Sequence, residues 1–436
     1  MLSRPSSSRS ALRPDDAVPA KPASVTAAGR EVGARQAIQI FLAFAFVYFF
    51  AALLRGITAT LAPVFSESLA LDAADLGLLA GAYFLGFALL QLPLGRALDR
   101  WGPRRTLLAL MLLAVLGCVA FSQAHSLTAL IAARFLTGAG LAACLMAPLT
   151  CFRRILSPAA QLRANSWMLM TGSLGMLAST LPVQWLLPLM GWRGLFLGLA
   201  ACLLICLLMV ASQVPRDPVA AADASRHKAG YLQIAAHPLF MRMAPLGFVL
   251  YGGMIAIQSL WAGPWLTQVV GASPGQAAQG LFAINLSMLC AFMLWGAVMP
   301  RLVGRGLGAV QLMQWGLPLP LILLALNLLL GSGAGAWHWA AWCVSCTFVS
   351  LSQPAIGVAF PAGLAGRALS AFNLVIFSGV FCVQWGLGLV IDVLQAWGQP
   401  PALAFRLALA GYGALCLLAY LWFLRPLRLG AAHSAA

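Results

Sequence analysis

The side chains of this 436-residue chain that could carry out chemistry are mainly arginines, amides and cysteines. Cys343 and Cys346 have the C-x-x-C spacing of a redox or metal site. They lie in the middle of an apolar run, however, where cysteine usually packs as a small apolar residue. No Ser/His/Asp set, phosphate-binding loop or pair of carboxylates can be assembled from the sequence. We therefore expect no catalytic residues, no metal and no cofactor.

The densest charge cluster is the segment PLGRALDRWGPRRTLL at 93–108, which places four arginines and Asp99 between two long runs without charge. A carboxylate beside several guanidinium groups can form a charge-assisted network that is made in one conformation and broken in another. Basic residues alone would also anchor the segment at a membrane surface, but such anchoring does not require an aspartate. We therefore predict a conformational latch here.

Other polar and aromatic residues lie inside apolar runs, several of them at spacings of seven or eleven that share one helical face. A mid-membrane arginine costs about 2.5–3.5 kcal/mol on insertion scales and usually has a function. Arg55, near the outer end of its run, could instead snorkel to the interface, tryptophans could form an interfacial belt, and amides could join neighbouring helices. The candidates for a substrate pathway are Tyr48, Arg55, Arg134, Tyr251, Gln258, Trp265, Asn373 and Gln384.

The elements that must position these residues are membrane helices. Hydrophobic residues make up 62% of the chain, charged residues 8%, and the mean hydropathy is +0.91, which exceeds what a soluble core of this length could bury. Because lipid cannot satisfy free backbone groups, each apolar run of about 20 residues must be helical. Twelve such runs occur, at 38–61, 77–98, 105–123, 127–150, 164–187, 193–213, 243–266, 279–299, 309–330, 337–360, 370–392 and 403–424. The predicted fold is all-α, with twelve transmembrane helices.

The basic residues predict the orientation of these helices. With both termini in the cytoplasm, the cytoplasmic segments hold 21 of the 26 Lys and Arg residues, and the periplasmic loops hold only Arg193. This asymmetry follows the positive-inside rule and explains the net charge of +16 without a nucleic-acid partner. We expect a multi-pass protein of a bacterial inner membrane, with the lipid bilayer and a small-molecule substrate as its partners.

The chain is predicted to consist of two six-helix halves. An irregular charged stretch separates six runs from the other six, which indicates the following division. The predicted parts are a disordered cytoplasmic tail at 1–35, a bundle at 36–213, a cytoplasmic loop at 214–242, a second bundle at 243–425 and a short tail at 426–436.

Weak internal repeats support a duplication. The motif at 95–105 reappears as GAVMPRLVGRG at 296–306, where Pro300 replaces the aspartate. RANS before Gly175 is echoed by RALS before Gly379. Both correspondences are about 200 residues apart, as expected of a duplicated unit.

The pattern G-x-x-x-D-R-x-G-x-R-R between the second and third runs, within two related halves, resembles the major facilitator superfamily over residues 36–425. RFLTGAG at 134–140 and GWRGLF at 191–196 are similar to motifs of its fourth and sixth helices. The resemblance implies a cytoplasmic gating motif in which Gly95 allows close helix packing and Asp99 pairs with arginines of the loop or of a neighbouring helix. Its arginines brace the cytoplasmic ends of the helices in the outward-facing state. This motif comprises Gly95, Asp99, Arg100, Gly102, Arg104 and Arg105.

Further resemblances concern the substrate. LWAGPWL at 260–266 and GRALSAFN at 366–373 are similar to bacterial permeases for sugar phosphates and organic anions, and the fifth run lacks the glycine pairs of drug/proton antiporters. Apart from Asp99, the runs contain one acid, Asp392, at the end of its run, so arginines without buried acids favour an anionic substrate.

The sequence therefore predicts a monomeric secondary transporter that works by alternating access on a small organic anion, with an ion as a further transported partner. A drug or metabolite exporter and a non-transporting membrane sensor remain as alternatives. A central loop of about 30 residues offers little surface for docking a signalling partner, which argues against the sensor.

Overall fold

The computed structural model describes residues 33–216 and 230–425 of the chain. Within these ranges the chain is helical and contains no strand, which confirms the predicted all-α class. The predicted tails at 1–35 and 426–436 fall outside the described residues except for 33–35, as does the middle of the predicted central loop.

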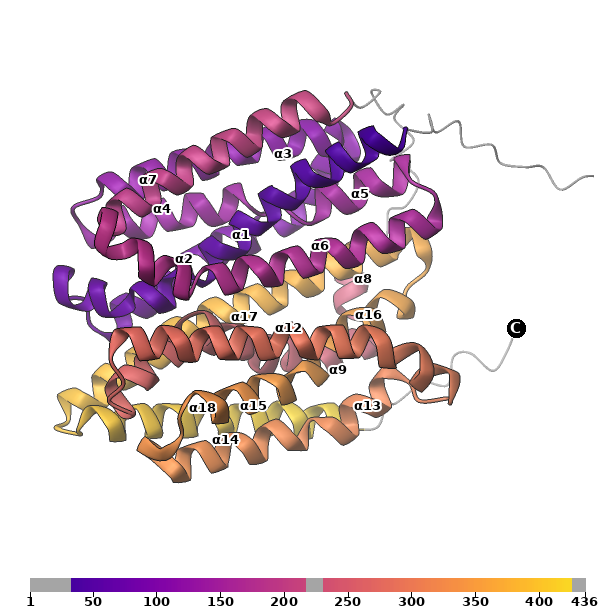
Figure 1. The fold of residues 1–436 in the computed structure, drawn as a ribbon. Coiled ribbons are helices and arrows are strands. Elements are labelled where there is room, and N and C mark those ends of the chain that lie inside the picture. The colour runs from indigo at the N-terminus through magenta and orange to yellow at the C-terminus, as the bar shows by residue number, and fades with distance from the viewer. Residues whose placement is uncertain (1–32, 217–229, 426–436) are drawn as a thin grey trace, which may run out of the picture.

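The helices form two groups that lie side by side with their axes roughly parallel (Figure 1). The first group, coloured indigo to magenta, consists of α1 (Ala34–Leu69), α2 (Ala73–Leu89), α3 (Gln91–Gln123), α4 (Leu127–Gly140), α5 (Met146–Ile155), α6 (Pro158–Ala178) and α7 (Leu181–Gln213).

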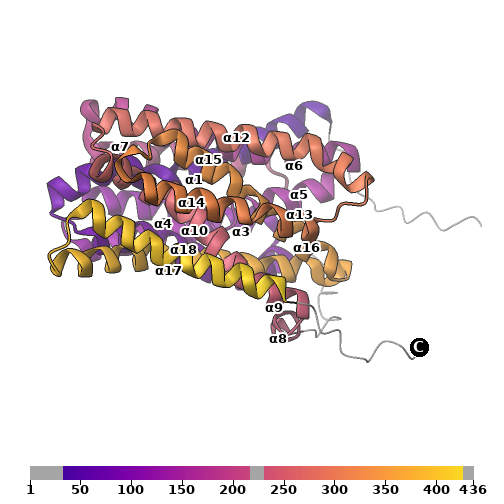
Figure 2. The same cartoon turned by 90° about the horizontal axis from the view of Figure 1, so that it is seen from below.

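The second group begins with the short helices α8 (Tyr231–Ala235) and α9 (Pro238–Pro245). An interrupted helix follows, made of η1 (Leu246–Tyr251), α10 (Gly252–Ala256), η2 (Ile257–Trp261), α11 (Ala262–Pro264) and η3 (Trp265–Val269). The remaining elements are α12 (Pro274–Gly304), α13 (Ala309–Gly316), α14 (Pro318–Leu330), η4 (Gly331–Gly333), α15 (Ala336–Cys346), η5 (Thr347–Leu351), α16 (Ser352–Ala359), α17 (Ala362–Ala396) and α18 (Pro401–Leu424). Figure 2 shows α17 and α18 packed along each other.

All twelve predicted runs lie on helical segments, but not all are unbroken spans. Nine helices in the described ranges are long and apolar enough to cross a bilayer, or ten if α2 and the start of α3 form one span bent by 41°. A turn at 141–145 divides the fourth predicted run into α4 and α5. The first half of α6 carries Gln161, Arg163 and Asn165, which make it less apolar.

Two glycines form sharp turns inside helices that are otherwise continuous. Gly102, in α3, has φ 79°, and Gly191, in α7, has φ 64°, in the left-handed region that only glycine adopts at little cost. Both belong to motifs noted in the sequence, and both separate one membrane-crossing segment from the next. The turn geometry accounts for glycine at these positions.

The two halves meet along several helix pairs. Helix α17 packs along α2, α12 packs against α6, and η2 and α11 pack against α1. The close approach of α1 and α11 depends on Gly263, because a Cβ atom there would lie 2.6 Å from the carbonyl oxygen of Ala59. In Figure 1 the start of α1, the end of α7 and the end of α18 lie at the same end of the bundle.

The predicted central loop differs from expectation. Its described C-terminal part is not irregular, because α8 and the start of α9 occupy it. The hydroxyl of Tyr231 in α8 donates a hydrogen bond of 3.4 Å to the carbonyl of Leu92 in α3. This part of the loop therefore contacts the first half at the start of α3.

Candidate functional site: an arginine cluster between the halves

Arg55 lies near the middle of α1, in contrast to the predicted position near the outer end of its helix. The difference arises because α1 continues through Pro63 to Leu69 rather than ending at residue 61. With 36 residues it is about 54 Å long, more than the hydrocarbon core requires. Arg55 is therefore positioned inside the bundle and not at a helix end.

The guanidinium of Arg55 interacts with two tyrosine hydroxyls, those of Tyr48 in α1 and Tyr83 in α2. Cys144, in the turn between α4 and α5, and Tyr251, in η1 of the second half, complete its electrostatic surroundings. We call these five residues the Arg55 cluster. It brings together both halves, and Tyr83 and Cys144 are members that the sequence alone did not indicate.

Glycines on neighbouring helices allow close packing against the two tyrosines of the first half. A Cβ atom at Gly172 in α6 would lie 2.4 Å from Cε1 of Tyr48, and one at Gly138 in α4 would lie 1.8 Å from the carbonyl oxygen of Tyr83. The hydroxyl of Tyr83 also donates a hydrogen bond of 3.1 Å to the carbonyl of Ala51. Close helix packing thus fixes both rings beside Arg55.

The positive charge of Arg55 has no carboxylate partner among the described side chains. The groups that act on it are the two tyrosines and Cys144, and its Nε atom is buried without a hydrogen-bond partner in the described part of the chain. A buried nitrogen donor is normally satisfied by an acceptor. The cluster therefore retains donor capacity for an anion.

Arg134 also has an Nε atom without a hydrogen-bond partner in the described part of the chain, but its terminal nitrogens are bonded to α1. It is 1% exposed, and its two terminal nitrogens donate to the carbonyl of Leu54 at 2.9 Å and to Oγ1 of Thr58 at 2.7 Å. Its guanidinium also lies 5.2 Å from the centre of the Tyr83 ring, within the range of a cation–π contact. These hydrogen bonds join α4 to α1 at Leu54 and Thr58, which precede and follow Arg55 in the sequence.

Amide side chains of the second half pair with polar groups on other helices. Nε2 of Gln258 in η2 donates to Oδ1 of Asn285 in α12 at 2.9 Å, and Nε2 of Gln384 in α17 donates to Oγ of Ser259 at 3.0 Å. Asn373 accepts a bond of 2.8 Å from Gln353 in α16. Both η2 and α17 pack on the first half, against α1 and α2 respectively.

Trp265 packs within the second half. It is fully buried, its Nε1 donates to the carbonyl of Ala334 at 3.0 Å, and its ring lies edge-on to Trp339 at 5.2 Å. Residues 251, 258 and 265 were expected on one face because they are seven apart. The helix that carries them contains the π-helical segments η1, η2 and η3, and among the described residues Gln258 pairs with Asn285 whereas Trp265 contacts Ala334 and Trp339.

The predicted gating motif lies beside the end of α7. The side chain of Asp99 is outside the part of the chain that the structure describes. Arg104 donates to the carbonyl of Ala211 in α7, and Arg100 and Arg105 are exposed. A Cβ atom at Gly95 would meet nothing within 4 Å, so no neighbouring helix packs closely against this glycine in this conformation.

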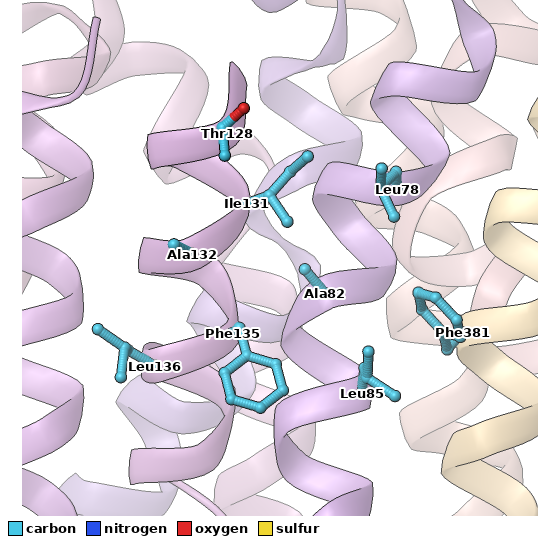
Figure 3. A pocket seen from close by; sticks show the side chains of 9 residues that line it. All are labelled: Leu78, Ala82, Leu85, Thr128, Ile131, Ala132, Phe135, Leu136 and Phe381. Atoms are coloured by element: carbon cyan, nitrogen blue, oxygen red, sulfur yellow. The ribbon is translucent and has the colours of Figure 1, made fainter. Parts of the chain in front are cut away.

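A separate groove between α2 and α4 is almost entirely apolar (Figure 3). It has a volume of about 490 Å³ and shares no residue with the Arg55 cluster. Phe381 of α17 closes one side and Phe135 of α4 another, and the hydroxyl of Thr128 is the one polar group drawn in its wall. The groove lacks the donors that an anion would require.

Comparison with known proteins places this architecture in a family. The model of the Major Facilitator Superfamily matches residues 44–383, whereas no curated protein is similar to the chain at a significant level. A D-xylose-proton symporter has a TM-score of 0.71 at 16% identity, with 89% of this chain and 97% of that chain covered.

Two further solved structures have the same fold. A bacterial homolog of the human lysosomal transporter Spinster, inward-facing and unoccupied, has a TM-score of 0.70 at 16% identity, covering 90% and 97% of the two chains. The nucleoside transporter NupG has a TM-score of 0.70 at 15% identity, covering 88% and 100%. Since the family model spans most of the chain and the folds agree, this chain belongs to the Major Facilitator Superfamily of membrane transporters.

Proposed function

We propose that this chain is a secondary active transporter that moves a small organic anion across the membrane by alternating access. The observation that carries the proposal is Arg55, a guanidinium between the two halves without a carboxylate partner among the described side chains. A half-buried charge without an oppositely charged partner is costly, and a bound carboxylate or phosphate would neutralise it.

The composition of the Arg55 cluster supports a site that changes during transport. Arg55, Tyr48 and Tyr83 belong to the first half, and Tyr251 belongs to the second. Movement of one half against the other therefore alters the distance across which a ligand can be held. A ligand bound in the cluster would be coupled to that movement, as secondary transport requires.

The placement in the membrane is also part of the proposal. The described residues at the end of the bundle where α1 starts and α18 ends include Arg35, Arg100, Arg105, Arg301 and Arg425. The opposite end carries Glu67, Asp72 and Asp75, which precede or begin α2. We propose a monomer in a bacterial inner membrane, with the arginine-rich end in the cytoplasm.

The experiment is a substrate screen followed by counterflow in proteoliposomes. Anionic, neutral and cationic metabolites are tested for uptake, and the identified substrate is then used with Arg55→Lys and Arg55→Gln. Loss of a forked donor in a partly desolvated site costs about 1.5–3 kcal/mol, which lowers apparent affinity roughly 10- to 150-fold. Arg406→Gln is the matched control, because Arg406 donates to the carbonyl of Leu328 within the second half.

Specific outcomes would contradict the proposal. A preferred cationic substrate, or wild-type affinity in Arg55→Gln, would exclude the organic-anion site. Absence of counterflow for every metabolite in folded protein would instead favour a non-transporting sensor.

A further inference from the structure

Resting on the proposed alternating access, we infer that the contact between the start of α2 and the end of α17 is a proton-sensitive latch. It takes up one proton when the two halves close at this end of the bundle and releases that proton when they separate. The latch consists of Asp72 from the first half and Asp392 from the second, and we call it the outer latch. It lies at the end of the bundle opposite the described termini.

The first turn of α2 binds two carboxylates through three consecutive backbone N–H groups. The N–H groups of Ala73 and Ala74 donate to Asp392 at 3.1 and 2.7 Å. The next one, that of Asp75, donates to Oδ1 of Asp72 at 2.8 Å. Since successive N–H groups of one helical turn are close neighbours, the carboxylates that accept from them must also be neighbours. The side chains of Asp72 and Asp392 are accordingly within hydrogen-bonding reach of each other.

The surroundings of this pair do not neutralise two negative charges. The start of a helix carries only about half of a positive elementary charge. Within the described ranges, Asp72 is the one charged side chain that acts on Asp392, and Asp75 adds a further acid to the same turn. Arg406, at the start of α18, donates to the carbonyl of Leu328 instead. Two carboxylates in contact repel each other, and a proton bound between them removes that repulsion.

The hydrogen bonds indicate which carboxylate holds the proton in the closed latch. Asp392 accepts two backbone bonds and Asp72 accepts one, and hydrogen bonds to an ionised carboxylate favour its charged form. With the proton on Asp72, its hydroxyl can donate to Asp392, which keeps its negative charge at the start of the helix. The protonated latch therefore contains one hydrogen bond between the halves that the ionised latch lacks.

Separation of the halves must break this pair. The two helices approach closely here, because a Cβ atom at Gly388 in α17 would lie 2.3 Å from the carbonyl oxygen of Ala73. The bundle is therefore closed at this end in the structure. When α17 moves away, Asp72 loses its partner and ionises in water. Closure thus binds a proton, so that by linkage a lower pH favours the closed form, at pH values above the ordinary aspartate pKa of about 3.9.

The distance between two spin labels tests the inference on the purified, full-length protein in lipid nanodiscs. The labels are attached to Ser68→Cys in α1 and Ala396→Cys in α17, two exposed positions at this end, after the exposed Cys290 and Cys382 are replaced by serine. Labels attached before the pH is changed keep thiol chemistry out of the result. The ratio of short to long distances should rise about tenfold from pH ~7.5 to pH ~5.5, since one proton allows at most tenfold per pH unit.

Variants assign the proton to the outer latch. Asp72→Asn keeps the oxygen that caps α2 and supplies an N–H donor to Asp392 without a proton, so the short distance should predominate at both pH values. Asp392→Ala removes the bonds to α2, which should lower the ratio and abolish its pH dependence. Glu67→Gln is the control, because Glu67 is an exposed acid at the same end, and it should match the wild-type protein.

The outcomes separate this inference from the proposed function. If the wild-type ratio is the same at both pH values while Asp392→Ala still lengthens the distance, the latch is not proton-sensitive and alternating access stands. If Asp72→Asn retains the full pH dependence, another group binds the proton and the inference is wrong. If no variant and no pH value produces the long distance, the halves do not separate at this end, and the proposed alternating access fails together with the latch.

Discussion

The carboxylate of Asp392, near the end of α17, accepts a hydrogen bond of 2.7 Å from the backbone N–H of Ala74 at the start of α2. Its other oxygen accepts from the N–H of Ala73 at 3.1 Å. A residue of the second half therefore caps a helix of the first half, where free N–H groups and the helix dipole favour a negative charge. The bond joins the halves at the end of the bundle opposite the described termini.

We predict that Asp392→Asn weakens closure at this end. The amide removes the charge but keeps the shape and one acceptor oxygen. Loss of one bond, and of the charge that strengthens the other, costs about 1–2 kcal/mol at a partly exposed site. The occupancy of the closed conformation should fall several-fold, measured by maleimide labelling of a cysteine introduced at Ala73. Glu67→Gln is the control, since Glu67 is an exposed acid near the same end. Unchanged labelling in Asp392→Asn would show that the hydrogen bonds of Asp392 do not stabilise the closed conformation.

Arg134→Lys should lower stability rather than substrate affinity. A lysine cannot donate to the carbonyl of Leu54 and to Thr58 in the same forked geometry, so at least one buried acceptor loses its partner, at a cost of about 1–3 kcal/mol. The midpoint of thermal unfolding in detergent and the abundance in the membrane should both fall. Apparent affinity per folded molecule should stay within a few-fold of wild type, in contrast to Arg55→Lys; the reverse pattern would assign Arg134 to the substrate.

Gly138→Ala should separate α4 from α2. The added Cβ would lie 1.8 Å from a backbone oxygen of Tyr83, which cannot move without displacing the helix, so we expect a loss of about 1–3 kcal/mol. Gly386→Ala in α17 is the matched control, because its Cβ would meet nothing within 4 Å and alanine favours a helix by about 0.5–1 kcal/mol. The two unfolding midpoints should therefore shift in opposite directions; equal midpoints would contradict the packing argument.

Asp99→Asn tests the latch predicted at the cytoplasmic ends of the helices. If the carboxylate pairs with arginines in one conformation, the amide should leave membrane abundance near normal and reduce transport sharply. Counterflow rates and the labelling of cysteines introduced near Arg105 measure the two effects. Normal transport together with normal abundance would indicate that the segment 93–108 acts only as a basic membrane anchor.

Hydropathy determined the helical class and the positions of the helices, because lipid forces every apolar run to satisfy its backbone internally. All twelve predicted runs contain helical segments, although turns at 141–145 and 179–180 interrupt the fourth and fifth. Gly102 and Gly191, which the sequence placed in motifs, form turns inside α3 and α7. The spacing of seven also identified Tyr48 and Arg55 as a pair, since both lie on one regular helix.

The tertiary structure decided which side chains meet across helices. Tyr83 lies beside Arg55 on a helix that packs closely against α4 at Gly138. Arg134 instead donates a hydrogen bond to the backbone of α1. Trp265 is fully buried against Trp339 and Ala334 of the second half, contacts that the spacing of seven did not indicate. Helix rotation, local pitch and the distance between axes are properties of the packed bundle, and a pattern along one chain segment does not contain them.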